Sequence, residues 1–292
     1  MGAGRWGRLI LRDLRRLGCE VVVVRPPSLS DQQPLPSDVG TVGELIECDG
    51  VEGVVIATPA TTHYSITLEA LKLGVPVAVE KPLTIDTKHA KEIAAIGTGR
   101  LFVLHKWVYH PGVMALRHVV REQVLGRVCG LRTTRTQSAV DCADVDAVWT
   151  LAPHDLSIVH AVLGSIPIPR SACGVAAPRG GLASIVGILG EDPWAVVEVG
   201  SGFPGPASRQ IVLHASHGVA RLPSAEASSL EIFRHDGRRQ DVVLPRTEPL
   251  LDELQVFRDH ILGGPPPPTG VDGGVAVVEA LTELRRLAQA RG

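Results

Sequence analysis

The 292-residue chain lacks any apolar run approaching the roughly 18–20 residues that a membrane-spanning helix needs. It also lacks a strong charge of either sign, since the formal net charge is −2 and no run of basic residues stands out. Nucleic-acid binding therefore has no electrostatic support. Arginines at positions 5, 8, 12, 15 and 16 interrupt the start of the chain, so no secretory signal peptide is expected.

Cysteine is scarce, with five residues scattered along the chain and no Cys-x-x-Cys spacing. An odd number without paired spacing is typical neither of a disulfide framework nor of a structural zinc site. We therefore expect reduced thiols, a cytoplasmic protein and no bound metal.

Lysine and aromatic residues are also few: five of the 29 basic residues are lysine, and aromatic residues make up 3% of the chain. Lysine and aromatic residues nevertheless occur together at one point in the sequence, at Lys106, Trp107 and Tyr109. Such a cluster either packs two domains together or lines a binding site. The residues alone leave both interpretations open.

Glycine is plentiful, and Gly2, Gly4 and Gly7 spell Gly-x-Gly-x-x-Gly at the start of the chain. In dinucleotide-binding folds this turn follows a β-strand and places the pyrophosphate on a helix N-terminus. A helix and a buried strand follow here at the right distance for a βαβ unit, but only Met1 precedes the motif. The segment predicted to contact a dinucleotide comprises Gly2, Gly4, Arg5, Trp6 and Gly7.

The strand that should precede the motif lies at the centre of the usual 3-2-1-4-5-6 strand order. Without it, the backbone groups of its two neighbours lack partners, at roughly 1–3 kcal/mol for each buried group. Our hypothesis is that the recorded start is too late and that an apolar strand precedes Gly2. If Met1 is the true start, weak cofactor binding is expected.

The first hundred residues alternate between β-branched apolar runs and helical periodicity. This alternation is typical of βαβ units, whose parallel strands are buried on both faces. It predicts strands at 20–25, 53–57, 75–80 and 100–105, and helices at 8–17, 41–48, 61–73 and 85–96.

The pattern changes after about residue 105. Helices are predicted at 111–123, 151–163, 251–262 and 275–290, and strands at 127–137, 182–189, 194–200, 210–215, 220–222, 230–235 and 240–244. We therefore predict an α/β domain with a Rossmann-like parallel sheet over residues 1–105, its first strand missing or truncated. An α+β domain with a mainly antiparallel open sheet follows over residues 106–292, and its last helix can pack back on the first domain.

The residue that ends the second strand of such a fold selects the cofactor. An acidic residue binds the ribose 2′-hydroxyl of NAD, whereas a basic residue accommodates the 2′-phosphate of NADP. Arg25 stands there, and its planar guanidinium suits phosphate. The alternative is an arginine that is simply solvated. We predict NADP as the cofactor, with NAD possible.

Short polar motifs follow two of the predicted parallel strands, at the edge of the sheet where open α/β folds bind ligands. The first contains Thr58, Pro59 and His63, and the second contains Glu80 and Lys81. Taken with GAGRWG, the phrases ATPATTH, VPVAVEKPL, LHKWVYHPGV and APHDLSIVHAVLG resemble the glucose–fructose oxidoreductase / inositol dehydrogenase / rhizopine catabolism (Gfo/Idh/MocA) family. The resemblance covers nearly the whole chain.

The resemblance implies that Lys81 lies beside the nicotinamide and exchanges the proton of the substrate hydroxyl. It implies a cis peptide between Lys81 and Pro82, because cis bonds are nearly confined to X-Pro. The same phrases imply cofactor contacts by Thr58, Pro59, His63 and Glu80.

In the second domain, the resemblance implies that His154 opens a helix and shares the proton transfer. Asp155, next to it, either faces the substrate or complements the helix dipole. The substrate pocket would begin at Lys106, Trp107 and Tyr109.

The chain departs from the family pattern at one position. Inositol dehydrogenase-like members carry an aspartate four residues before the histidine, where this chain has Thr150. Asp144, Asp146 and Asp155 are candidates to replace that carboxylate. A full Lys–Asp–His set is doubtful, so we expect Lys81 and His154 to carry more of the chemistry.

Together these features predict an NADP-dependent oxidoreductase that moves a hydride between nicotinamide and a ring carbon of a sugar, sugar nucleotide, cyclitol or related polyol. One alternative is a catalytically weakened homologue that binds dinucleotide as a partner or regulatory protein. Another is an imine or enone reductase of specialised metabolism. The resemblance implies a homodimer or homotetramer formed through the open sheet of the second domain.

Overall fold

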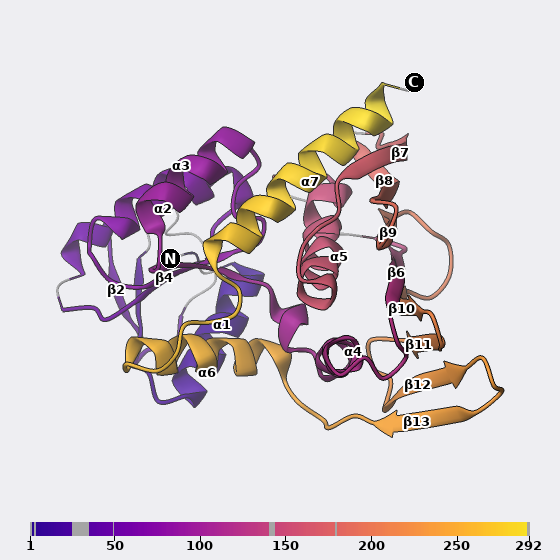
Figure 1. Ribbon diagram of the computed structural model, residues 1–292. Helices are drawn as coiled ribbons and strands as arrows, with labels where there is room; N and C mark the ends of the chain where they lie inside the picture. The colour runs from indigo at the N-terminus through magenta and orange to yellow at the C-terminus, as the bar shows by residue number, and fades with distance from the viewer. Residues whose placement is uncertain are drawn as a thin grey trace. The chain divides into compact units, whose positions relative to one another are not determined.

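The computed structural model describes residues 2, 4–24, 35–48, 50–139, 144–178 and 180–290. Their contacts group the chain into two compact units (Figure 1). The first comprises Met1–Lys106 and Glu248–Val275, and the second comprises Trp107–Thr247 and Ala276–Gly292. The first unit therefore takes in a late segment that the sequence pattern assigned to the second domain.

The first unit alternates helices with short parallel strands, as the periodicity predicts. Two adjacent strands, β4 and β5, are buried along their whole length, which explains why all their residues but Glu80 are apolar. The elements are α1 (Arg5–Arg16), β1 (Val22–Val24), β2 (Gly40–Val42), η2 (Leu45–Glu47), β3 (Val54–Ile56), η3 (Ala60–Thr62), α2 (His63–Leu71), β4 (Val77–Glu80), α3 (Thr87–Gly97), β5 (Leu101–Leu104) and α6 (Pro249–Ile261).

One prediction in this unit is wrong: residues 41–48 do not form a helix. Gly40–Val42 instead pairs in parallel with β1, with Val22 opposite Gly40. Only Leu45–Glu47 is helical, as a 3-10 turn that a capping box between Glu44 and Glu47 closes. Pairing with a neighbouring strand has overridden the local helical pattern.

The five strands of this unit form two sheets rather than one. Within the described residues, β1 pairs with β2 alone, and a second sheet has the order β3-β4-β5. In the usual order, one more parallel strand would lie between β1 and β3. The far edge of β5 is covered, because the Val103 amide donates to the Thr269 carbonyl at 2.9 Å and Phe102 bridges to Gly270.

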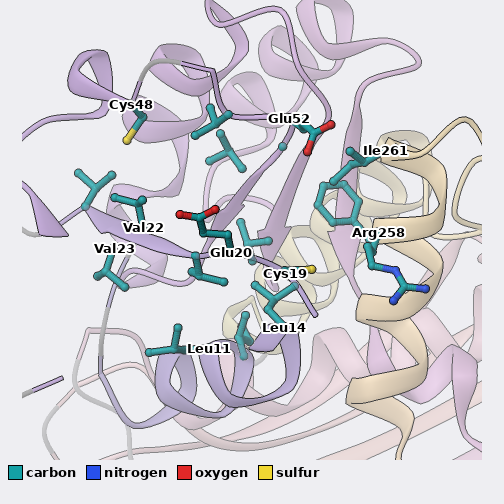
Figure 2. A pocket seen from close by; sticks show the side chains of 18 of the residues that line it. Leu11, Leu14, Cys19, Glu20, Val22, Val23, Cys48, Glu52, Arg258 and Ile261 are labelled. Atoms are coloured by element: carbon teal, nitrogen blue, oxygen red, sulfur yellow. The ribbon is translucent and has the colours of Figure 1, made fainter. Parts of the chain in front are cut away.

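A cavity of about 620 Å³ occupies the position between β1 and β3. We call it the interstrand slot (Figure 2). Its walls are mainly apolar and come from α1, β1, β3 and α6, with Leu11, Leu14, Val22 and Ile261 among them. Val22 is 41% exposed, although the strands of a parallel sheet are normally buried on both faces.

Gly2 lies at one end of the interstrand slot. It is a lining residue, and a Cβ built on it would stand 2.4 Å from the carbonyl oxygen of Ala57, just past the carboxyl end of β3. A strand that ran through the slot into Gly2 would therefore be parallel to β1 and β3. Such a strand would supply partners to both of their open edges.

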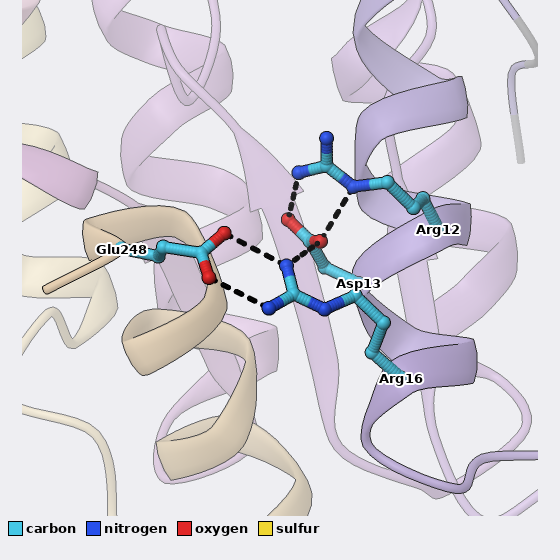
Figure 3. A network of polar contacts seen from close by, with 4 residues as sticks. All are labelled: Arg12, Asp13, Arg16 and Glu248. Atoms are coloured by element: carbon cyan, nitrogen blue, oxygen red, sulfur yellow. Dashed lines mark hydrogen bonds and ion pairs between the residues drawn. The ribbon is translucent and has the colours of Figure 1, made fainter.

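Helix α6 fastens α1 to the three-stranded sheet. Leu254 and Phe257 of α6 share one buried cluster with Ile10 of α1 and with Ala78 and Leu104 of the sheet. At the surface, Arg16 donates two hydrogen bonds to Glu248, at 2.7 and 2.6 Å (Figure 3). The buried carboxylate of Asp13 also accepts from Arg12 and Arg16, so α1 carries a charge network on the side that faces α6.

The second unit is built on one eight-stranded sheet with the order β13-β12-β11-β10-β6-β9-β8-β7. Only β6 and β9 pair in parallel within it, so the predicted mainly antiparallel sheet is confirmed. Its strands are β6 (Val128–Gln137), β7 (Pro169–Ala176), β8 (Leu182–Leu189), β9 (Trp194–Ser201), β10 (Ser208–Ala215), β11 (Gly218–Leu222), β12 (Ser229–Arg234) and β13 (Arg239–Val243).

Helix α5 (Ala147–Leu163) packs on β6, β8 and β9 and covers one face of that sheet. The remaining helical elements are η4 (Lys106–Tyr109), α4 (Pro111–Arg121) and α7 (Val271–Gln289). β7 was missed from the sequence because it is an edge strand that begins at a proline and has mostly exposed side chains. In the part of the chain that the structure describes, no helix is long and apolar enough to span a bilayer.

The open edges around the interstrand slot lead to a stability prediction. We expect that about six alternating valine and isoleucine residues, added ahead of Gly2, will pair with β1 and β3. If only two of these added side chains are buried in the slot, the free energy of unfolding rises by about 3 kcal/mol, at about 1.5 kcal/mol for each side chain. Urea unfolding followed by circular dichroism should therefore show a higher midpoint than for the unextended chain. A serine–glycine segment of equal length is the control, and equal midpoints for the two segments would contradict the prediction.

Candidate active site

The glycine turn at the start of α1 is built by close backbone approaches. Gly2 has φ +86°, and a Cβ on Gly7 would stand 2.1 Å from the Gly2 carbonyl oxygen. Gly4 is the N-cap of α1 and has no side chain with which to satisfy the amides of the first turn. Arg5 begins the helix, and no acidic residue lies in its first turn. This end of α1 therefore fits an anionic pyrophosphate.

His63 joins the loops that follow β3 and β4. Its Nδ1 lies 2.7 Å from the Pro82 carbonyl oxygen, and its Nε2 lies 2.9 Å from the Thr58 carbonyl oxygen. The ring is 1% exposed. His63 therefore positions the Thr58-Pro59 loop and the Glu80-Lys81-Pro82 loop, both of which the sequence predicts to hold cofactor.

Glu80 connects the glycine turn to the candidate catalytic lysine. Trp6 donates its indole N–H to one carboxylate oxygen of Glu80, and the Lys81 amide donates to the other at 3.1 Å. Lys106 places its ammonium 4.5 Å from the centre of the Trp6 ring. Burial raises the pKa of Glu80, and the charge of Lys81 opposes that rise. The Lys81–Pro82 peptide is cis, as expected.

A second buried acid, Glu253 of α6, was not found from the sequence. It is 1% exposed, and burial raises the pKa of its carboxyl well above the usual range, with the like charge of Glu80 adding to the effect. A signal did exist, because Glu253 lies in the apolar stripe of α6 formed by Leu250, Leu254 and Phe257. An acid in such a stripe is buried when the helix packs.

In the second unit, Trp107 and Asp155 meet at an arginine that the sequence analysis did not single out. Arg135 of β6 lies 4.5 Å from the centre of the Trp107 ring, and its Nε donates to Asp155 Oδ2 at 2.5 Å. Both ion-pair partners are at least 95% buried. Burial raises the pKa of Asp155, and the charge of Arg135 opposes that rise. Tyr109 is also buried in this unit.

Two expectations about α5 are wrong, because the helix begins earlier than predicted. Asp146 caps it by accepting from the Trp149 amide at 3.0 Å, so His154 lies well inside the helix rather than at its start. Asp155 therefore cannot complement the dipole of the first turn; it binds Arg135 instead. Pro153 lies inside the same helix, which the sequence pattern began only at Leu151.

Two of the three carboxylates that could replace the missing aspartate, Asp146 and Asp155, are engaged elsewhere. Asp146 pairs with Arg285 at 2.7 Å and accepts from the Leu182 amide at 2.8 Å. Thr150 donates its hydroxyl to the Asp146 carbonyl at 3.0 Å. The structure thus gives neither Asp146 nor Asp155 to His154 as a carboxylate partner.

The predicted site residues accordingly fall into two groups. One group, in the first unit, surrounds the glycine turn and the carboxyl ends of β3 and β4; the other, in the second unit, lies along α5, β6 and η4. Arg25 lies outside the described residues. The four described cysteines are free thiols, whereas Cys142 lies outside the described residues. Among the residues described, no three His, Cys, Asp or Glu side chains gather as a metal site would require.

The segment of sequence that contains the first group matches a known family. Residues 2–102 match the model of the Gfo/Idh/MocA family, an oxidoreductase family with an NAD-binding Rossmann fold. This segment belongs to the Gfo/Idh/MocA family. The resemblance predicted from the motifs is confirmed there.

Curated relatives carry the likeness further along the chain. UDP-N-acetylglucosamine 3-dehydrogenase of Acidithiobacillus ferrooxidans is 31% identical over 44% of this chain and 41% of its own length. An inositol 2-dehydrogenase of Azotobacter vinelandii is 27% identical over 90% of this chain and 84% of its own length. The matches to the first four curated relatives span only 26% to 43% of those proteins.

Solved structures show the same fold over the whole chain. The A. ferrooxidans UDP-N-acetylglucosamine 3-dehydrogenase has a TM-score of 0.85 at 21% identity, covering 99% of this chain and 96% of its own. GenD2 from gentamicin A biosynthesis, solved in complex with NAD, has a TM-score of 0.82 at 22% identity, covering 100% and 93%. At these identities the likeness concerns the fold.

The raised pKa of Glu253 gives a stability prediction with a definite sign. A carboxyl with a raised folded pKa contributes its full stability below its unfolded pKa of about 4.3 and loses it as pH rises toward the folded value. Glu253→Gln has no such titration. Its urea midpoint relative to the unmodified chain should therefore be higher at pH well above 5 than near pH 4.

Glu69→Gln is the matched control, because Glu69 is an exposed helical glutamate. Its midpoint relative to the unmodified chain should change little between the two pH values. An equal offset of Glu253→Gln at both pH values would show that the Glu253 carboxyl does not titrate abnormally.

Proposed function

We propose that this chain is a nicotinamide-dinucleotide-dependent oxidoreductase that interconverts a ring CH–OH group and a ketone on a carbohydrate-like substrate. The observation that carries the proposal is the placement of Lys81. It directly follows Glu80, whose buried carboxylate binds both the Lys81 amide and Trp6 of the dinucleotide turn. Through Glu80, the main chain at Lys81 is thus joined to the same helix that fits the pyrophosphate.

The roles follow from the chemistry of the side chains. The first-turn amides of α1 hold the anionic pyrophosphate, and Thr58 and Pro59 border the dinucleotide on a loop that His63 positions. When bound, the nicotinamide supplies or accepts the hydride. Lys81 takes the hydroxyl proton during oxidation and returns it during reduction. His154, which is half-buried on α5, is the second group that handles this proton.

The substrate class is proposed from the relatives. Two of them are named for the dehydrogenation of UDP-N-acetylglucosamine and of inositol, which are both polyhydroxylated rings. We propose a sugar, sugar nucleotide, cyclitol or related polyol for this chain. NADP is the proposed cofactor, because Arg25 directly follows the residues of β1 in the sequence.

A homologue that binds dinucleotide without turning over substrate is the second candidate. It is favoured by Thr150, which donates to a main-chain carbonyl, and by the engagement of Asp146 and Asp155 elsewhere. Those two carboxylates are then bound to arginines and not committed to stabilising a protonated His154. The activity of the unmodified chain, measured as described below, separates the two candidates.

We also propose that copies of this chain associate through the face of the eight-stranded sheet opposite α5. Val175, Val186 and Ile188 lie on that face, and each is at least 43% exposed. Apolar residues exposed together on a sheet face are typical of protein interfaces. A homodimer or homotetramer would bury them.

Replacing Lys81 tests the proposed chemistry. Lys81→Met should lower kcat by about 10²- to 10⁴-fold, because it removes the proton-transferring group and leaves the glycine turn intact. The absorbance of reduced nicotinamide, followed with UDP-N-acetylglucosamine and myo-inositol, measures the loss. Nucleotide affinity, measured by fluorescence quenching, should change little.

Lys88→Met, at an exposed position of α3, is the control and should keep full activity. If the unmodified chain binds NADPH but turns over no polyhydroxylated substrate, the second candidate is correct. A Lys81→Met variant with unchanged kcat would remove Lys81 from the mechanism.

Cofactor choice is tested at Arg25. Arg25→Gln should lower kcat/KM for NADP by about 10- to 100-fold, since it removes charge-assisted hydrogen bonds to the 2′-phosphate. The value for NAD should stay the same. Arg117→Gln, at an exposed position of α4, controls for general loss of charge. Equal losses with both cofactors would reject the proposed role of Arg25.

A further inference from the structure

Two arginines stand directly opposite each other in the sheet of the second unit. Arg209 of β10 is the register partner of Arg135 of β6 in an antiparallel pair. Paired residues lie on the same face, and Arg135 contacts Asp155 of α5, so both arginines point to the face that α5 covers. Like charges directly opposite each other in such a pair are destabilising. The pair therefore needs a compensating anion.

Among the described residues, Arg135 has that compensation and Arg209 has no ion pair. Asp155 pairs with Arg135, and the Trp107 ring covers the Arg135 guanidinium. Arg209 is half-buried, and its closest hydrogen bond is a long one, from Nη2 to the Gln137 amide oxygen at 3.4 Å. Its buried Nε has no hydrogen-bond partner among the described residues. Among the described residues, no carboxylate is therefore bound to the N–H donors of the Arg209 guanidinium.

The other charges near Arg209 do not remove this excess. Asp155 attracts Arg209, but its carboxylate is already bound to Arg135. Glu226 also attracts Arg209, yet it is exposed and forms no ion pair with it among the described residues. Burial and the charge of Arg135 lower the pKa of Arg209, in keeping with a cation short of partners.

We propose that Arg209 binds an oxyanion of the substrate, so that the substrate is an acidic carbohydrate derivative rather than a neutral polyol. A carboxylate of a sugar acid and a phosphate of a sugar nucleotide both present the paired oxygens that a guanidinium fork binds. Asp155, which binds Arg135, belongs to the same helix α5 as His154, so the proposed oxyanion site and the proposed proton-handling group are both in the second unit. The proposal rests on the proposed function only in naming the ligand as substrate.

The test measures binding rather than turnover. Calorimetry with UDP, glucuronate and myo-inositol supplies a phosphate probe, a carboxylate probe and a neutral probe. The unmodified chain should bind at least one anionic probe about tenfold or more tightly than myo-inositol. Arg209→Gln should lose that preference by about 10- to 100-fold, and Arg209→Lys should recover part of it. Whichever anionic probe responds identifies the substrate group.

Arg132→Gln is the matched control, because Arg132 is on the same strand as Arg135 but alternates to the opposite face and pairs with Glu198. It should leave binding of all three probes unchanged. Arg209→Gln should also unfold at the same or a higher urea concentration than the unmodified chain, because it removes the repulsion across the strands. This readout separates loss of binding from loss of folding.

The outcomes distinguish this proposal from the proposed function. Equal binding of the three probes by the unmodified chain, or unchanged anion binding in Arg209→Gln, would overturn the oxyanion site even if the chain oxidises neutral polyols. Arg209-dependent anion binding without any turnover would leave the oxyanion site standing and remove the oxidoreductase function.

Discussion

The hydrogen bond from Trp6 to Glu80 joins the helix of the glycine turn to the end of strand β4, directly before Lys81. Everything proposed for the first unit depends on it, because α1 and β4 carry the two halves of the site. A buried carboxylate is costly unless it is bound. Glu80 accepts from an indole and from the Lys81 amide, and Lys81 and Lys106 add positive charge nearby. The same contacts that satisfy the carboxylate therefore also fix the lysine.

Sequence periodicity predicted the class of both units, because long apolar runs and helical stripes report burial directly. It failed where partners distant in the sequence decide the structure. Gly40–Val42 became a strand by pairing with β1. The start of α5 was placed too late, because the cap at Asp146 also depends on Arg285, far away in the chain.

The candidate site was likewise predictable where the signal is local and not where it depends on distant residues. The glycine turn and the Glu80-Lys81-Pro82 phrase have local signatures and were predicted from them. Glu253, Arg135 and Arg209 belong to no sequence motif, since each matters through a neighbour on another element: Glu80, Asp155 and Arg135 respectively. Charged residues at core-facing positions of helices and strands were the available signal, and alternation along β6 does place Arg135 on the same face as buried Leu131.

The interstrand slot has a consequence for the behaviour of the protein in solution. Its two sides, β1 and β3, present rows of backbone donors and acceptors with apolar valines beside them. An open apolar strand edge is a template for a strand from another chain. Any strand that docks in the slot, whether from this chain or from another copy, would therefore hide both edges and their valines from solvent at once.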